Sequence, residues 1–335
     1  MESLAVRYRP KTFDEIIGQD NIVKILKAQV STNAQRNTYL FVGPAGDGKT
    51  STARILANEL NKGQGSPIEL DAASHNGVED VRSIIEQAQT KSLDSEYKCF
   101  IIDECHAISS AGWQAFLKLI EEPPAKSIFI FCTTNPEKVP LTITSRVQRY
   151  DFQMMSQENI INRLRYVCDR ESLTLVRLKA LEFIAKQANG HMRDALTMLD
   201  QCIAFSTDIT LENAVKCLGA VDYDDMLYLT DYIIRGDKTN AIERLNDIYD
   251  SGKDIKMFMK QFTYFLLDVS KYRIGCDWKY ISTPRLNAYE TWLEELTADE
   301  LDECFRLMKT CMKLNAEIKY SAVPKLDIEA TLMTF

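Results

Sequence analysis

The sequence predicts three parts in order: an α/β domain built on a parallel sheet, a small helical domain and an all-helical domain. Up to residue 155, short apolar runs alternate with helical patterns, as in parallel strands joined by crossover helices. Beyond that point strand signals fade and helical periodicity takes over. The 335 residues are enough for two or three domains that each bury a core.

Five apolar runs of the first part have the length and flanking turns of strands. We expect these strands at 39–42, 68–71, 99–102, 128–132 and 147–152. The helical patterns between them begin near Lys49, Val78, Ala111 and Leu141. Ser156 is a suitable N-cap for the first helix of the second part. We therefore predict domains at 1–155, 156–220 and 221–335.

Composition limits the classes of function. Apolar residues make up 45% and charged residues 26%, as in ordinary globular proteins. A net charge of −8 means that any contact with nucleic acid has to come from a local patch. No apolar run is long enough to span a membrane and no leader pattern is present, so we expect a cytoplasmic protein without membrane contact. Nine cysteines without a CxxC pair predict neither disulfides nor zinc.

A glycine-rich loop directly follows the first predicted strand and directly precedes a helix. In such a loop backbone N–H groups surround phosphates, Lys49 reaches the β and γ phosphates, and the Thr50 hydroxyl is available to Mg²⁺. An acidic Asp47 should repel nucleotide unless its side chain points to solvent. The loop fits GxxxxGK[ST] and, with the next residue, comprises Gly43, Pro44, Ala45, Gly46, Asp47, Gly48, Lys49, Thr50 and Ser51.

Two carboxylates, Asp103 and Glu104, end a buried strand further along the chain. Asp103 is expected to hold Mg²⁺ through its water shell, and Glu104 to act as general base toward the attacking water. The alternative is that both carboxylates only cap the next helix. Together with the phosphate loop, the pair predicts an ATPase that uses ATP and Mg²⁺.

The strand at 128–132 ends in Thr133-Thr134-Asn135. A central strand next to the loop would bring Thr134 to the γ-phosphate, where it could sense the nucleotide. A plain turn from strand to loop is the competing interpretation.

Several segments, read with these motifs, resemble the gamma/tau (DnaX) family of bacterial clamp-loader subunits, which are AAA+ ATPases of DNA polymerase III. Their order and spacing match that family, and the likeness runs along essentially the whole chain. They are Tyr8-Arg9-Pro10, Asp71-Ala72-Ala73-Ser74, LKLIEEPP at 117–124, Thr133-Thr134-Asn135-Pro136, Ser145-Arg146-Val147 and AEIKYSAVPKLDIE at 316–329.

The resemblance implies an AAA+ domain, a helical lid and a helical oligomerisation collar. It implies that Thr134 is a sensor residue and that Arg193 touches the nucleotide from the lid. Arg146 would be an arginine finger that reaches the γ-phosphate in a neighbouring subunit. Taken alone, an arginine at such a position is more often a solvated or ion-paired surface charge, so both roles depend on the resemblance. Three residues near the N-terminus would cradle adenine: Tyr8, Arg9 and Pro10.

The function implied is that of the ATPase motor subunit of a DNA sliding-clamp loader. Its partners would be other loader subunits in a homo- and hetero-oligomeric pentamer, the sliding clamp and primer-template DNA. Lys118 and Arg82 match positions that line the DNA chamber, although both could be ordinary surface charges. Two alternatives remain: a scaffold subunit that binds nucleotide but hydrolyses little, and another AAA+ DNA motor similar to RuvB or replication factor C.

The sequence departs from the family pattern in two places. Family members usually carry a four-cysteine zinc module after the phosphate-loop helix, whereas here residues 61–67 bridge that gap. The chain also stops at the collar, without the long tail of tau forms. We therefore expect a short form that binds no zinc.

Overall fold

The computed structural model describes residues 2–92, 94–218, 223–252, 254–277, 280–281, 283 and 287–335. The chain groups into two compact units, Met1–Asp200 and Gln201–Phe335. The boundary between the units lies within helix α9 (Met192–Phe205). The predicted domain boundary between residues 220 and 221 lies outside the described residues.

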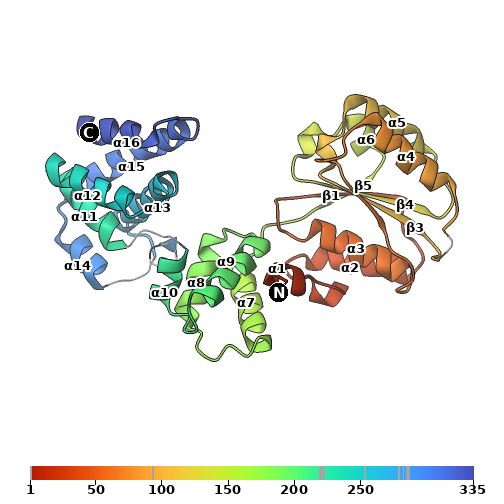
Figure 1. Ribbon diagram of the computed structural model, residues 1–335, viewed down its shortest axis with the longest axis horizontal. Coiled ribbons are helices and arrows are strands. Elements are labelled where there is room, and N and C mark those ends of the chain that lie inside the picture. The colour runs from red at the N-terminus through yellow and green to blue at the C-terminus, as the bar shows by residue number, and fades with distance from the viewer. Residues whose placement is uncertain are drawn as a thin grey trace. The chain divides into compact units, whose positions relative to one another are not determined.

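A five-stranded sheet forms the centre of the first unit (Figure 1). Every paired strand is parallel to its neighbour, and the order across the sheet is β2-β3-β4-β1-β5. The predicted α/β class is confirmed, and the five predicted strands agree to within a residue at each end. The strands are β1 (Thr38–Val42), β2 (Ile68–Asp71), β3 (Lys98–Asp103), β4 (Ser127–Thr133) and β5 (Gln148–Asp151).

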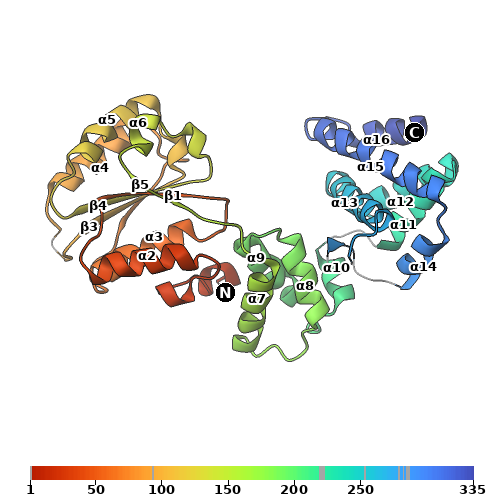
Figure 2. The same ribbon diagram turned by 180° about the vertical axis from the view of Figure 1, so that it is seen from behind.

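Helices cover both faces of this sheet, as Figures 1 and 2 show. Because successive strand residues point to opposite faces, each central strand contributes to two cores. In β1, Tyr39 and Phe41 join one core, while Leu40 and Val42 join the other. One face carries α2 (Asp20–Ser31) and α3 (Lys49–Leu60); the other carries α4 (Val78–Gln89), α5 (Ser110–Glu121) and α6 (Leu141–Thr144).

The start of the chain contacts the helical segment that follows the sheet. The Ser156 side chain caps α7 by accepting a 3.1 Å hydrogen bond from Asn159 N, as the sequence predicts. Glu171, just after α7, accepts hydrogen bonds from Arg7 Nη1 at 2.9 Å and from the Tyr8 hydroxyl at 2.5 Å. The other elements of the first unit are α1 (Leu4–Arg7), η1 (Phe13–Glu15), η2 (Cys105–Ala107), η3 (Pro136–Lys138), α7 (Gln157–Arg170) and α8 (Leu178–Gln187).

The secondary-structure elements of the second unit, within the part of the chain that the structure describes, are all helices. A large apolar cluster forms much of its core, and α13 and α15 contribute heavily to it, including the stacked rings of Phe258 and Phe262. No helix in the described part of the chain has both the length and the apolar character needed to cross a bilayer. The helices are α10 (Leu211–Cys217), α11 (Tyr223–Ile234), α12 (Lys238–Asp250), α13 (Ile255–Arg273), α14 (Asn287–Glu295), α15 (Ala298–Ile318) and α16 (Pro324–Thr334).

Candidate nucleotide-binding site

The glycine-rich loop connects β1 to α3 at the carboxyl edge of the sheet. Gly46 and Gly48 have φ angles of +75° and +99°, a region in which a side chain would be strained. Helix α3 begins at Lys49, so its unsatisfied N–H groups and the positive end of its dipole lie at the loop. This geometry is suited to an anion such as a phosphate chain.

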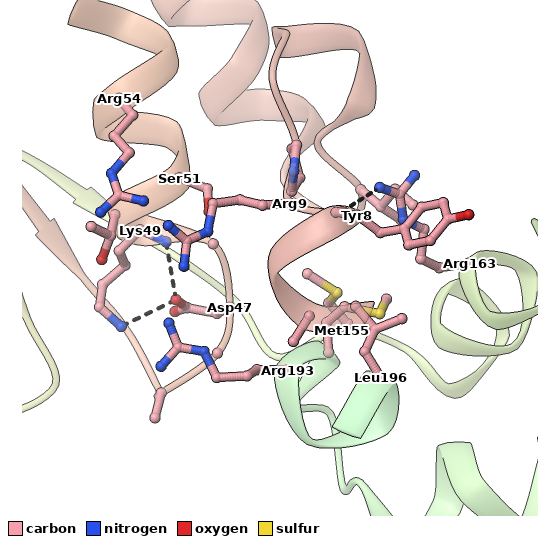
Figure 3. Close-up of a pocket in the computed structure, with 18 of the residues that line it drawn as sticks. Tyr8, Arg9, Asp47, Lys49, Ser51, Arg54, Met155, Arg163, Arg193 and Leu196 are labelled. Atoms are coloured by element: carbon pink, nitrogen blue, oxygen red, sulfur yellow. Dashed lines mark hydrogen bonds and ion pairs between the residues drawn. The ribbon is translucent and has the colours of Figure 1, made fainter. Parts of the chain in front are cut away.

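A pocket opens in front of this loop within the first unit (Figure 3). The loop forms one side of it from Ala45 to Ser51. Tyr8, Arg9 and Pro10 form another side, and Arg193 at the start of α9 lines it as well. Figure 3 shows the Arg193 side chain pointing toward the loop near Asp47. The structure thus brings the predicted adenine-side residues and the predicted lid arginine to one pocket.

Lys49 is turned back into its own loop. Its Nζ donates to Gly43 O at 2.8 Å and to Pro44 O at 2.5 Å, and it lies 3.1 Å from Asp47 Oδ1. Only 6% of the Lys49 side chain and 1% of the Asp47 side chain are exposed. The Asp47 side chain therefore does not point to solvent, which is the orientation in which its negative charge would not repel a bound phosphate. Burial raises the pKa of the Asp47 carboxyl, and the Lys49 charge opposes that rise.

Thr50 and Asp103, the two predicted magnesium ligands, are in direct contact. Thr50 Oγ1 donates a 2.7 Å hydrogen bond to Asp103 Oδ2 across the strand that separates β1 from β3. Asp103 Oδ1 accepts from Glu104 N at 3.0 Å. The carboxyl ends of parallel strands thus bring the acidic pair to the phosphate loop.

Glu104 has a left-handed backbone, with φ +46° and ψ +42°. A non-glycine residue in this conformation stores strain, and such residues concentrate at functional sites. Thr134 Oγ1 donates to Glu104 Oε2 at 3.2 Å, and His106 Nδ1 lies 3.3 Å from the same oxygen. The proposed sensor and His106, which no motif in the sequence marks for this role, therefore both contact the carboxylate proposed as base.

Three of the predicted residues lie outside this pocket. Arg146, just after α6, is ion-paired with Glu121 at 2.9 Å and partly exposed. Lys118 is exposed on α5. Arg82 is exposed on α4 and lies 2.8 Å from Glu79. None of the three belongs to the pocket lining of its own chain.

Sequence reasoning missed several residues that approach the nucleotide pocket. Arg163 of α7 lines the pocket and donates to Tyr8 O at 2.8 Å. Arg54 lines it from α3 and is paired with Glu69 of β2. His191 Nδ1 lies 2.6 Å from Ala45 O in the phosphate loop. No local motif marks these side chains, because their positions depend on packing between distant segments.

The order of the strands completes the description of the site. Strand β4 lies between β1, which leads into the phosphate loop, and β3, which ends in the acidic pair. The helical segment after the sheet contributes Arg193 to the same pocket. The fold and this site define a P-loop ATPase of the AAA+ class.

Three family models match consecutive parts of the chain. Residues 66–156 match the DNA polymerase III delta subunit, and residues 159–208 match the ATPase lid domain of a DNA polymerase III clamp-loader subunit. Residues 209–334 match domain III of DNA polymerase III subunits gamma and tau. The chain belongs to the family of DNA polymerase III gamma and tau subunits.

Individual relatives are similar to most of the chain. The chain is 34% identical to the Bacillus subtilis DNA polymerase III subunit tau over 97% of its own length and 62% of that protein. It is also 35% identical to Protein STICHEL-like 1 of Arabidopsis thaliana, over 80% of this chain and 26% of that protein. The chain thus spans less than two thirds of either relative.

Solved structures support the fold. The Thermotoga maritima RuvB Holliday junction branch migration motor aligns with a TM-score of 0.54. The alignment covers 74% of this chain and 86% of that one, at 22% sequence identity. At this identity the likeness concerns the fold alone.

Proposed function

We propose that this chain is the ATPase motor subunit of a DNA sliding-clamp loader. The observation that carries the proposal is the 2.7 Å hydrogen bond from Thr50 Oγ1 to Asp103 Oδ2, which joins the phosphate loop to the acidic pair. Because the chain belongs to the gamma and tau family, we infer that this ATPase site serves clamp loading in DNA replication. The cytoplasmic location expected from the sequence belongs to the same proposal.

The site fits Mg²⁺ and ATP. Thr50 and Asp103 offer oxygen ligands, and the N-terminus of α3 together with Lys49 offers positive charge to phosphates. Among the described residues, no three His, Cys, Asp or Glu side chains form a metal-binding group on their own. A Mg²⁺ ion here would therefore depend on the nucleotide and water for its other ligands, and when bound it would neutralise charge on the phosphates.

Each side chain around the reacting phosphate has a role in this proposal. Lys49 binds the β and γ phosphates after it leaves its present partners. Glu104 accepts a proton from the attacking water as general base. Thr134 orients Glu104 through the hydrogen bond between them. Arg193 approaches the nucleotide from the helical segment.

Assembly is the second half of the proposal. Arg146 lies away from the pocket of its own chain, which suits a residue that acts in a neighbouring subunit. We infer that Arg146 supplies the arginine finger in trans and that nucleotide sites lie between subunits of a pentamer. Domain III, the lid and the AAA+ domain would each have the role that the resemblance implies.

Two exposed cationic side chains are proposed to contact primer-template DNA. Lys118 and Arg82 belong to α5 and α4, which pack against each other on one face of the sheet. Because the chain as a whole is acidic, phosphate contacts have to be local, as a pair of exposed cations allows. The sliding clamp and the other loader subunits complete the proposed partners.

One observation favours a second candidate function. Lys49 is bound by its own loop and by Asp47, which weakens the site for phosphates. A scaffold subunit that binds nucleotide poorly and hydrolyses little is consistent with this contact. The intact set of Lys49, Asp103, Glu104 and Arg146 favours the motor.

A clamp-loading assay tests the choice. The chain, the other loader subunits and the sliding clamp of its host are incubated with ATP and a primed circular DNA, and clamp retained on the DNA is measured. The motor proposal expects retained clamp that disappears with Lys49→Ala. Equal loading by the wild-type and Lys49→Ala chains would leave the scaffold role.

A further inference from the structure

Asp47, a residue of the phosphate loop, has a buried carboxylate. Asp47 is 1% exposed, and its Oδ1 accepts from the backbone N of Lys49 at 3.3 Å and lies 3.1 Å from Lys49 Nζ. Its Oδ2 is buried and has no hydrogen-bond partner. A Cβ built on Gly43 would lie 2.2 Å from that same Oδ2. Asp47 thus fills the space between the two ends of the loop.

The Lys49 ammonium has no donor left for a ligand in this arrangement. An ammonium group has three N–H donors, and Lys49 Nζ has three acceptors: Gly43 O, Pro44 O and Asp47 Oδ1. Two of these acceptors are neutral carbonyls, which hold a cation less strongly than a carboxylate does. Asp47 is therefore the partner that contributes most to the retracted position of Lys49.

Binding of a phosphate chain requires this contact to be exchanged. If Lys49 turns to the β and γ phosphates, Asp47 is left as a buried carboxylate with its main partner removed. An unpaired buried charge is strongly unfavourable, so part of the attraction between Lys49 and the phosphates is offset. Figure 3 shows the Lys49 and Arg193 side chains both near Asp47, so Arg193 is the remaining cation at hand.

We propose that Asp47 is an affinity-determining residue of this site, an internal competitor that holds Lys49 until nucleoside polyphosphate draws the lysine away. The inference rests on the proposed function, since it assumes that the pocket binds ATP. In this inference, Asp47 makes the affinity of the site for ATP and ADP lower than the affinity that the same loop would have without this carboxylate.

The test is a double-mutant cycle on nucleotide affinity. Isothermal calorimetry with Mg·ATP and with ADP, at nucleotide concentrations up to millimolar, compares the wild-type chain with Asp47→Asn, Lys49→Ala and the double variant. Asp47→Thr is a second variant in case Asp47→Asn does not fold. Asp151→Asn is the matched control, because Asp151 ends β5 beside Val42 at the same sheet edge and its partner is Arg149.

Asp47→Asn and Asp47→Thr are expected to tighten Mg·ATP binding by about tenfold, as exchange of a charge-assisted contact for a neutral one implies. In the Lys49→Ala background the same change should alter affinity less than about twofold, because the lysine that mediates the effect is gone. Asp151→Asn should also stay within about twofold.

Three results would overturn the inference. The first is unchanged or weaker binding in both Asp47 variants with intact unfolding temperature. The second is a full gain in the Lys49→Ala background, which would mean direct repulsion of phosphate by Asp47. The third is an equal gain in Asp151→Asn. A wild-type chain that binds no nucleotide, with variants that bind none either, would instead count against the proposed ATPase function itself.

Discussion

Arg146 Nε lies 2.9 Å from Glu121 Oε1, so the proposed arginine finger is ion-paired within its own chain. Glu121 belongs to the LKLIEEPP segment of α5, and Arg146 Nη1 also donates to Thr142 O at 2.8 Å. Both side chains of the pair are more than two fifths exposed. An exposed pair contributes about 1 kcal/mol or less, so this contact orders the arginine without preventing its transfer to a neighbouring phosphate.

Replacing Arg146 should lower ATP turnover by the assembled loader without changing ATP binding by the isolated chain. We expect Arg146→Ala to lower ATP turnover of the assembled loader by about 10³-fold or more, the range for a finger supplied in trans. The ATP affinity of the isolated chain should not change. Turnover of the complex and calorimetry of the isolated chain measure the two quantities.

Arg149→Ala is the control for Arg146, since Arg149 is an exposed arginine three positions further on, paired with Asp151 at the surface. An equal loss of turnover in this control would mean a general effect of charge. Weaker ATP binding by the isolated Arg146→Ala chain would contradict action in trans.

Glu104 should separate binding from hydrolysis. Glu104→Gln keeps the shape of the side chain and removes the base, so ATP binding is retained while turnover falls by about 10²-fold or more. Calorimetry and single-turnover hydrolysis measure the two effects. Wild-type turnover in the variant would exclude Glu104 as the base and leave the hydrogen bond from Thr134 without a catalytic meaning.

Lys118 should matter only when DNA is present. Lys118→Ala is expected to reduce DNA-stimulated turnover, to leave basal turnover unchanged, and to lower the salt slope of DNA binding by about one. Lys179→Ala, an exposed lysine of α8, is the matched control. A loss of the same size without DNA would rule out a DNA contact at Lys118.

Thiol reactivity tests the cores of both units. Burial raises the pKa of Cys99 to about 12 and that of Cys168 to about 11, while Cys217 and Cys276 are partly exposed. The thiolate is the reactive form, so thiols with raised pKa values stay protonated and unreactive as pH rises through about 8 to 9.

Titration of the native chain with a disulfide reagent should therefore find two fast thiols and seven slow ones. Because burial raises the pKa of thiols such as Cys99 and Cys168, the slow thiols should stay slow as the pH rises through about 8 to 9. Four or more fast thiols would contradict the packing described for the buried cysteines.

Most of the fold of the first unit could be predicted from the sequence, because the central strands of its sheet are buried on both faces. Such strands appear as continuous apolar runs, and the run at 39–42 is followed at once by the phosphate loop. The meeting of Thr50 with Asp103 was also predictable, since carboxyl ends of parallel strands share one edge.

Other parts of the site could not be predicted from local pattern. The contact of Glu121 with Arg146 and that of His191 with Ala45 depend on the packing of segments distant in sequence. The direction of the Asp47 side chain depends on its packing against Gly43, where a Cβ would lie 2.2 Å from Asp47 Oδ2. No periodicity or motif encodes such packing.

The measurement that tests the central claim most directly is ATP turnover of the purified chain against its own concentration. It is made alone, and again with primed DNA, the sliding clamp and the other loader subunits. Shared sites predict turnover that rises faster than linearly with concentration and is stimulated by DNA and clamp. Turnover that stays negligible with every partner present, despite measurable ATP binding, would contradict the motor proposal.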